Sequence, residues 1–319
     1  MKIDLRIEAQ TTSVGERLAV LLATYDGARF LDAQLQSVAD QQWAGIDVFA
    51  SDDSSTDDTL NRLAGWQARW RRGGFVVSSA PRRGFAGNFR WLLVNSDVDA
   101  EYVAFCDQDD IWLADKTRAA AAALAPYGNR PALYCARTLI TDVEDRAIAM
   151  SPRFRRTPDF ANALVQSISG GNTMMMNRAA HALVREGARR TDFVSHDWFS
   201  YLLVSGSGGK VIFSDTPHVR YRQHGHNLVG ANRGLGATLR RLQFALGGRF
   251  VDWIDQNMRA MAACRDLLTP EAQAVYERFR AARIGPPLQR LVNLRRSGVY
   301  RQTPIGQFSL YMAGLLGKL

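Results

Sequence analysis

Short apolar runs alternate with helical patterns over the first 137 residues, and this alternation constrains the fold more than any other feature. The apolar runs have the length of strands and lie at residues 18–23, 46–51, 75–79, 102–106 and 132–137. The segments between them place apolar residues on one helical face, as Leu31, Leu35 and Val38 do. The sequence therefore predicts an α/β fold with an open, mostly parallel sheet flanked by helices.

The end of the chain differs from this pattern in both periodicity and charge. After residue 234 the sequence reads as mostly helical, which predicts an α/β domain over 1–234 and a helical C-terminal region over 235–319. The C-terminal region holds 13 Lys and Arg against 5 Asp and Glu, whereas the first 234 residues hold 27 against 26. A basic region on a neutral body favours an anionic partner, and nucleic acid and an anionic membrane surface both fit.

Several classes of protein are disfavoured. No apolar run reaches the roughly 18 residues that span a bilayer, and the polar N-terminus lacks the apolar core of a secretion signal. We therefore expect a cytoplasmic protein, either free or peripheral on the inner face of the cytoplasmic membrane. Cys106, Cys135 and Cys264 are far apart, which predicts buried free thiols. The G-x-G-x-x-G pattern is absent, and 206–210 lacks the flanking residues of a P-loop.

Polar clusters follow three of the predicted strands. They lie at 24–27, at 51–58 and at 107–110. In open parallel sheets, ligands bind where the carboxyl ends of the strands meet. Asp107 and Asp109 are separated by one residue, and two hard oxygen ligands at that spacing suit Mg²⁺ or Mn²⁺. The alternative is a solvated acidic turn at the start of a helix.

Taken together, these clusters resemble the family-2 glycosyltransferases, which have the GT-A fold. The residues that carry this resemblance are 21–38, 49–59 and 105–116. Four further segments are most similar to the rhamnosyltransferase-like branch that builds bacterial surface polysaccharides such as O-antigen, namely 107–112, 170–178, 196–199 and 221–230. The resemblance covers about residues 18–230, and one departure is Asp26, where the branch often has Asn.

The resemblance implies an inverting, metal-dependent enzyme that moves L-rhamnose from dTDP-rhamnose to a saccharide acceptor. This acceptor is either free or linked to a lipid. A UDP-hexose donor is the first alternative. A nucleotidyltransferase is disfavoured because its Gly-rich, Arg-containing N-terminal loop is missing. A non-enzymatic protein that binds nucleic acid or membranes through its basic region is the remaining alternative, although no nucleic-acid module is recognisable and no nucleic acid is expected.

The resemblance also assigns residues to the donor. Thr24, Tyr25 and Asp26 would line the base and ribose, with Tyr25 stacked on a pyrimidine. Asp52 would accept from the pyrimidine N3–H, with Asp53 beside it. The further donor contacts implied are Arg83, Asn88, Asp107 and, on the diphosphate, Arg222. The alternatives are helix capping for Asp52 and Asp53, a surface position for Arg83, an N-cap for Asn88 and a surface loop around Arg222.

The metal ligands and the catalytic base are assigned in the same way. The cation, Mg²⁺ or Mn²⁺, would be held by Asp107 and Asp109, with His224 as a third ligand, and Asp110 would cap the following helix. Asp197 would take the proton of the acceptor hydroxyl, and His196 would orient the acceptor. The alternative for Asp197 is a residue of the first helical turn that the helix dipole favours.

The last residues of the chain place six apolar residues at helical spacing, namely Ile305, Phe308, Met312, Leu315, Leu316 and Leu319. This apolar face either packs on the catalytic domain or lies in a membrane interface, and the two are compatible.

Overall fold

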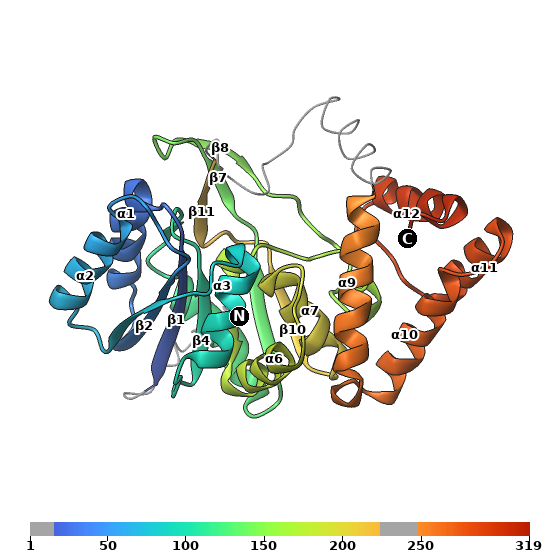
Figure 1. The fold of residues 1–319 in the computed structure, drawn as a ribbon, viewed down its shortest axis with the longest axis horizontal. Coiled ribbons are helices and arrows are strands. Elements are labelled where there is room, and N and C mark those ends of the chain that lie inside the picture. The colour runs from blue at the N-terminus through green and yellow to red at the C-terminus, as the bar shows by residue number, and fades with distance from the viewer. Residues whose placement is uncertain (1–15, 224–247) are drawn as a thin grey trace, which may run out of the picture.

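The structure is a computed structural model, and it describes residues 16–223 and 248–319. A seven-stranded sheet forms its centre (Figure 1). In spatial order its strands are β10 (Lys210–Ser214), β6 (Ala132–Ala136), β9 (Met175–Asn177), β4 (Tyr102–Cys106), β1 (Arg17–Thr24), β2 (Gly45–Asp52) and β3 (Phe75–Ser79). Every neighbouring pair is parallel except the two that involve β9. The prediction of a mostly parallel sheet is confirmed.

Helices cover both faces of this sheet, and the residues of β1 alternate between the two cores. Leu18, Val20 and Leu22 face the core under α1 (Ala28–Ala39), α2 (Thr59–Arg69) and α4 (Lys116–Leu124). Ala19 and Leu21 face the other core, under α3 (Gly84–Asn95), α6 (Arg178–Arg190) and α7 (His196–Gly206). A strand that is buried on both sides needs apolar residues at every position, which is why β1 reads as an unbroken apolar run.

A small second sheet begins directly after the acidic segment 107–110. Its strands in spatial order are β5 (Ile111–Trp112), β11 (Val219–Arg222), β7 (Leu139–Thr141) and β8 (Ala147–Met150). The expectation that Asp110 caps a helix is wrong, because Asp110 leads into β5 and α4 begins only at Lys116, after Asp115. The pairing of β5 with β11 brings the acidic segment and Arg222 together.

The C-terminal region is helical in its described part, as predicted. It consists of α9 (Arg249–Ala263), the short helix η3 (Arg265–Leu267), α10 (Pro270–Ala282), α11 (Pro287–Ser297) and α12 (Pro304–Leu316). Three further short helices lie earlier in the chain, namely η1 (Ala125–Tyr127), α5 (Phe160–Ala163) and η2 (Gly171–Thr173). Ile254 and Met261 of α9 join the same core as Phe199 and Leu203 of α7. The proposed boundary at residue 234 lies outside the described residues, so the division into two domains stays a prediction.

Hydrogen bonds fasten the C-terminal region to residues 157–166, which follow β8. The Tyr300 hydroxyl donates to Thr157 O (2.7 Å), and Asn162 Nδ2 donates to Tyr300 O (2.9 Å). The Gln302 N–H donates to Gln166 Oε1 (2.9 Å). Within the described ranges, no helix is both long and apolar enough to span a membrane. The three cysteines are buried free thiols, as predicted.

Candidate active site

The three polar segments predicted to form the site meet at the carboxyl ends of neighbouring strands. In the register of the sheet, Thr24 at the end of β1 lies opposite Asp52 at the end of β2. On the other side of β1, Leu22 lies opposite Cys106, the last residue of β4. The segments after β1, β2 and β4 therefore leave the sheet side by side, as expected for a ligand site of an open α/β sheet.

The loops after β1 and β4 are clamped together through one side-chain amide. Gln108 Oε1 accepts from the Tyr25 N–H (2.8 Å), and Gln108 Nε2 donates to Tyr25 O (2.8 Å). A Cβ on Gly27 would lie only 2.1 Å from Gln108 Oε1, so the clamp needs glycine at this position. The clamp leaves the Tyr25 ring 58% exposed, which suits stacking on a nucleotide base.

Asp26 shapes the turn that follows Tyr25. Its φ of 44° lies in the left-handed region, which Asn and Asp tolerate better than most residues. Its carboxylate accepts from the Thr56 N–H (2.7 Å), and its own N–H donates to Ser55 Oγ (2.9 Å). Because Asp supports this turn as Asn would, the departure at position 26 is compatible with the backbone of the site.

Asp52 is buried inside the loop after β2. One carboxylate oxygen accepts from Thr24 Oγ1 (2.9 Å) and from Ser55 Oγ (2.5 Å), and the other accepts from the Ser55 N–H (2.8 Å). The side chain is buried, at 2% exposed. Asp52 thus organises Thr24 and the following turn, and its contact with a nucleotide base stays a prediction.

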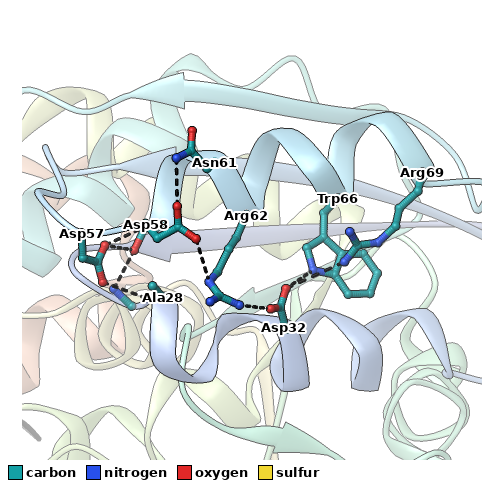
Figure 2. Close-up of polar contacts among 10 residues, drawn as sticks. Ala28, Asp32, Asp57, Asp58, Asn61, Arg62, Trp66 and Arg69 are labelled. Atoms are coloured by element: carbon teal, nitrogen blue, oxygen red, sulfur yellow. Dashed lines mark hydrogen bonds and ion pairs between the residues drawn. The ribbon is translucent and has the colours of Figure 1, made fainter.

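The end of the same loop caps α1, as Figure 2 shows. Asp57 Oδ2 accepts from the Ala28 N–H at the start of α1 (3.0 Å), and Asp57 Oδ1 accepts from the N–H (3.0 Å) and the hydroxyl of Thr59. Partial burial would raise the pKa of Asp57, but these hydrogen bonds outweigh it and lower the pKa. Further along, Asp32 of α1 pairs with Arg62 and accepts from Trp66 Nε1 (2.8 Å), both on α2. These contacts fix the loop after β2 to the start of α1, and α1 to α2.

Asp53 and Asn88 connect the site to α3. The Asp53 carboxylate accepts from the N–H groups of Arg83 (3.2 Å) and Gly84 (2.8 Å) at the start of the helix. Asn88 Nδ2 donates to Ser51 O (2.9 Å) and Thr24 O (3.2 Å) beneath the loops. The N-cap alternative for Asn88 is wrong, because α3 begins at Gly84. The Arg83 side chain is exposed beside the site.

A buried lysine lies next to the acidic segment. Asp110 is fully buried, and its carboxylate accepts from Asn172 Nδ2 (2.5 Å) and from the Arg222 N–H (3.2 Å). Lys116 is also buried, with its Nζ 3.4 Å from the ring centre of Trp112. Burial raises the pKa of Asp110, aided by the charges of Asp109 and Asp107. Burial lowers the pKa of Lys116 to about 7.

Asp107 and Asp197 lie close enough for their charges to interact. Burial, followed by the charges of Asp109 and Asp197, raises the pKa of Asp107 to about 8. Asp197 lies in the first turn of α7, and burial raises its pKa despite a hydrogen bond from the Ser195 side chain. Among the described residues, no hydrogen-bond donor reaches Asp197 Oδ1. This combination fits a general base, because the buried oxygen has no donor among the described residues and the pKa is shifted upward.

His196 does not face an acceptor, which corrects the expectation for this residue. Its ring stacks on Phe89 (ring centres 3.6 Å apart) and meets the edge of Phe105 (4.5 Å). Burial lowers its pKa to about 3. A Cβ on Gly171 would lie 1.9 Å from His196 Nε2. His196 is therefore a neutral core residue that packs beneath the backbone of η2.

The residues that could hold a divalent cation are only partly within the described structure. Asp107 and Asp109 follow β4 directly, whereas His224 lies outside the described residues. Over 16–223 and 248–319, no group of three or more His, Cys, Asp or Glu is arranged to hold a metal ion. Mg²⁺ and Mn²⁺ often take one or two carboxylates and complete their shells with phosphate oxygens and water. Two adjacent carboxylates whose charges repel each other fit a cation that is bound together with a diphosphate.

Arg222 lies beside this segment. Its guanidinium carbon is 4.7 Å from the ring centre of Phe30, and the side chain is buried. Its main-chain N–H holds Asp110, so β11 brings the predicted diphosphate ligand to the acidic segment.

Sequence reasoning missed two residues that build the site. Gln108 holds Tyr25 in place, and its position between two aspartates at a strand end was the only available signal. Lys116 is a buried amine whose charge interacts with Asp107 and Asp110, although lysine type and helical position both predict a surface residue.

Comparisons with known proteins show which family and which relatives this chain resembles. The sequence model described as Glycosyl transferase family 2 matches residues 19–184. The dTDP-rhamnosyl transferase RfbG of Shigella flexneri is 29% identical over 229 residues, which are 69% of this chain and 78% of that protein. The UDP-Glc:alpha-D-GlcNAc-diphosphoundecaprenol beta-1,3-glucosyltransferase WfaP of Escherichia coli is 26% identical over 104 residues, 32% of this chain and 38% of that protein.

Solved structures support the fold. Residues 1–349 of S. aureus TarS, crystallised with UDP-GlcNAc, superpose with a TM-score of 0.53 at 15% identity, over 89% of this chain and 93% of that one. At this identity the likeness concerns the fold alone, which is of the GT-A type. Glycosyltransferases with this fold commonly use a divalent metal.

Proposed function

The chain belongs to glycosyl transferase family 2, and from that premise we propose that it transfers L-rhamnose from dTDP-rhamnose to a saccharide acceptor in the synthesis of a bacterial surface polysaccharide such as O-antigen. That it is a glycosyltransferase follows from the family. The observation that carries the proposed mechanism is that Asp197, with a buried oxygen that has no donor among the described residues, acts electrostatically on Asp107 of the acidic segment after β4. The activity named for the relative RfbG supports dTDP-rhamnose as the donor.

The donor end of the site is assigned to the loops after β1 and β2. The Tyr25 ring offers a stacking surface for the base, and Thr24, Asp26, Asp52 and Asp53 frame the nucleoside. Arg83 and Arg222 supply positive charge near the phosphates. Asp107 and Asp109 would hold the divalent cation, which when bound neutralises the charge on the leaving nucleoside diphosphate.

The transfer itself is a single displacement with inversion at the anomeric carbon. The acceptor oxygen forms a bond to that carbon while the bond to the diphosphate oxygen breaks. Asp197 takes the proton of the attacking hydroxyl. Burial raises the pKa of Asp197, which makes the carboxylate a stronger base than a solvated aspartate. No covalent enzyme intermediate is needed, since one carboxylate suffices for one displacement.

The acceptor is assigned to a lipid-linked saccharide on the cytoplasmic face of the membrane. The relative WfaP is named for an acceptor on diphosphoundecaprenol, and the match covers only part of both chains. The small sheet and η2 both contact Asp110, and η2 packs on His196 beside Asp197, where they would shape the acceptor side.

Product analysis tests this function. The purified full-length chain is incubated with dTDP-rhamnose, Mn²⁺ and lipid extracts that carry truncated saccharides, and the products are resolved by mass spectrometry and NMR. We expect dTDP release coupled to a rhamnosylated acceptor with inverted configuration. Faster turnover of UDP-glucose would favour the UDP-hexose alternative. Release of pyrophosphate in place of nucleoside diphosphate would contradict glycosyl transfer.

A further inference from the structure

One side of α12 is apolar and open to water. Ile305 (70% exposed), Phe308 (66%), Met312 (37%) and Leu316 (54%) follow each other at helical spacing and form one stripe. The opposite side of the helix, with Leu310 and Ala313, is buried in the main core. Residues 304–316 contain no charged side chain. The helix thus packs on the protein by one side and presents a second apolar side that nothing described covers.

The neighbouring helix α11 also exposes apolar residues. Leu288 (75% exposed) and Val292 (47%) lie one helical turn apart on its outer side. A hollow of about 370 Å³ lies between the two helices and is lined by Leu291, Arg295 and Tyr311. We call the exposed apolar residues of α11 and α12 together the α11–α12 face. Large exposed apolar patches on monomeric proteins usually mark binding sites.

The charge around the α11–α12 face has a single sign. After Glu277 the chain contains no Asp or Glu up to Leu319, while the same stretch holds eight Lys and Arg. Arg290, Arg295 and Arg296 lie on α11, and Arg301 and Lys318 flank α12. A partner for this face must therefore offer both an apolar layer and negative charge.

From this combination we propose that the α11–α12 face docks on an anionic lipid surface. Phe308, Leu316 and Leu288 would enter the boundary between headgroups and acyl chains, and the arginines would contact the headgroup phosphates. A second copy of the chain fits less well, because a symmetric contact would bring two basic surfaces together without acidic residues to neutralise them. Nucleic acid would use the charge but leave the apolar stripe exposed.

The two C-terminal helices lie away from the strands that carry the site. In Figure 1, α11 and α12 lie at the right of the molecule, whereas β1 and β2, whose carboxyl ends border the site, lie at the left. Docking deepens the proposed function, because it would hold the enzyme near a lipid-linked acceptor, but lipid binding itself does not require that function.

Vesicle sedimentation with the full-length chain tests this docking. We expect binding to vesicles of phosphatidylethanolamine and phosphatidylglycerol, and little binding to phosphatidylcholine alone. The double variant F308S/M312S should bind at least tenfold more weakly, because it removes apolar contact from exposed positions without touching the core. R295Q should weaken vesicle binding about fivefold. It should leave the slope and the midpoint of the urea unfolding curve unchanged. V76S, an equally exposed apolar position on the edge strand β3, is the matched control and should bind like wild type.

Three results would overturn the docking. They are unchanged vesicle binding by F308S/M312S, equal binding to neutral and anionic vesicles, and a concentration-dependent dimer that F308S/M312S abolishes in the absence of lipid. Donor turnover on a water-soluble acceptor is measured in parallel and should be unaffected by F308S/M312S. Vesicle binding without any sugar transfer would contradict the proposed function and leave the docking standing, so the two failures are distinguishable.

Discussion

At the scale of single residues, the site is defined by carboxylates that burial has made less acidic. Asp107 and Asp197 both have raised pKa values because they are partly removed from water, and the Asp107 pKa is raised further by neighbouring negative charges. Asp52, Asp53 and Asp57 have a different role, since their oxygens are occupied by main-chain and hydroxyl donors. The same residue type therefore builds the loops at one strand end and carries the chemistry at another.

The Asp197→Asn variant should retain donor binding and lose turnover. Asparagine has nearly the same shape but cannot accept the proton, so we expect kcat to fall by about 10²–10⁴ while the donor dissociation constant changes less than twofold. Asp192→Asn, an exposed carboxylate that pairs with Arg90 near the start of the same helix, is the control. Near-normal kcat in Asp197→Asn would remove this residue from the mechanism.

The pH dependence of wild-type transferase activity should follow the ionisation of Asp197. Transfer needs the ionised form of Asp197, and burial raises its pKa. Activity should therefore decline as pH falls, and the midpoint of this acid limb should lie above about 3.9, the ordinary value for aspartate. An acid limb at or below that value would contradict the assignment.

Cation binding should displace a proton from Asp107. Its pKa is raised to about 8, so at neutral pH without a cation the carboxyl group is mostly protonated, whereas a bound cation needs the carboxylate. We expect Mn²⁺ affinity to rise with pH between 6 and 8, by up to about tenfold per unit for one proton. Calorimetry in buffers of different ionisation enthalpy measures the proton release. Asp107→Asn should lose the pH dependence, and a pH-independent wild-type affinity would contradict this coupling.

At the scale of elements, the strand ends are brought into register by side chains of the loops. Gln108 joins the loop after β4 to the loop after β1, and Asp57 joins the loop after β2 to α1. Neither contact lies within a strand or helix that periodicity can predict. Both depend on which strands are neighbours, and this is known only once the sheet order is known.

The Gln108→Ala variant should weaken donor binding while the fold is retained. It removes both hydrogen bonds that hold the Tyr25 main chain, so we expect a loss of about 1–2 kcal/mol, equivalent to roughly tenfold in the donor dissociation constant. Titration of dTDP with tryptophan fluorescence measures it. Gln67→Ala removes a glutamine that likewise donates to a main-chain carbonyl, that of Phe75, but at a distance from the site. An equal loss of affinity in Gln67→Ala would argue against a specific clamp.

The packing of η2 on α7 should not tolerate a side chain at Gly171. A Cβ there would overlap the His196 ring, which Phe89 and Phe105 hold from other sides. We expect Gly171→Ala to lower the free energy of unfolding by about 1–3 kcal/mol, measured by urea denaturation. Gly45→Ala is the matched control, since a Cβ at Gly45 meets nothing within 4 Å. A stable Gly171→Ala protein would mean that His196 can move aside.

Long strands could be predicted from the sequence, whereas strands of two or three residues could not. The apolar runs at 18–23, 46–51 and 102–106 became β1, β2 and β4 because each is long enough to show its pattern. The short strands β5 and β9 have two and three residues and pair antiparallel to their partners, so no periodicity marks them. The role of His196 was misjudged for a related reason, since only the packed structure shows which side of α7 faces the core.

At the scale of the whole molecule, the C-terminal helices serve two sides of the protein. Their inner residues complete the core that contains α7, the helix of Asp197, and Tyr300 and Gln302 fasten them to the segment 156–166. The outer residues of α11 and α12 form the apolar and basic face described above. The prediction that the C-terminal helices pack on the catalytic domain is confirmed for the helices as a group. Of the apolar positions predicted on the last helix, Leu319 joins this core, whereas Ile305, Phe308, Met312 and Leu316 are exposed. The membrane alternative for these exposed residues stays a prediction.

A thermal-shift panel shows whether this site binds a nucleotide together with a divalent cation, as a nucleotide-sugar donor requires. The full-length protein is heated with dTDP, UDP, GDP or ADP, each in Mn²⁺ and in EDTA. A nucleotide at 100 times its dissociation constant stabilises the folded state by about 2.7 kcal/mol, which raises Tm by a few degrees. We predict such a rise with dTDP, less with UDP, and only when Mn²⁺ is present. No rise with any nucleotide in Mn²⁺ would contradict the account.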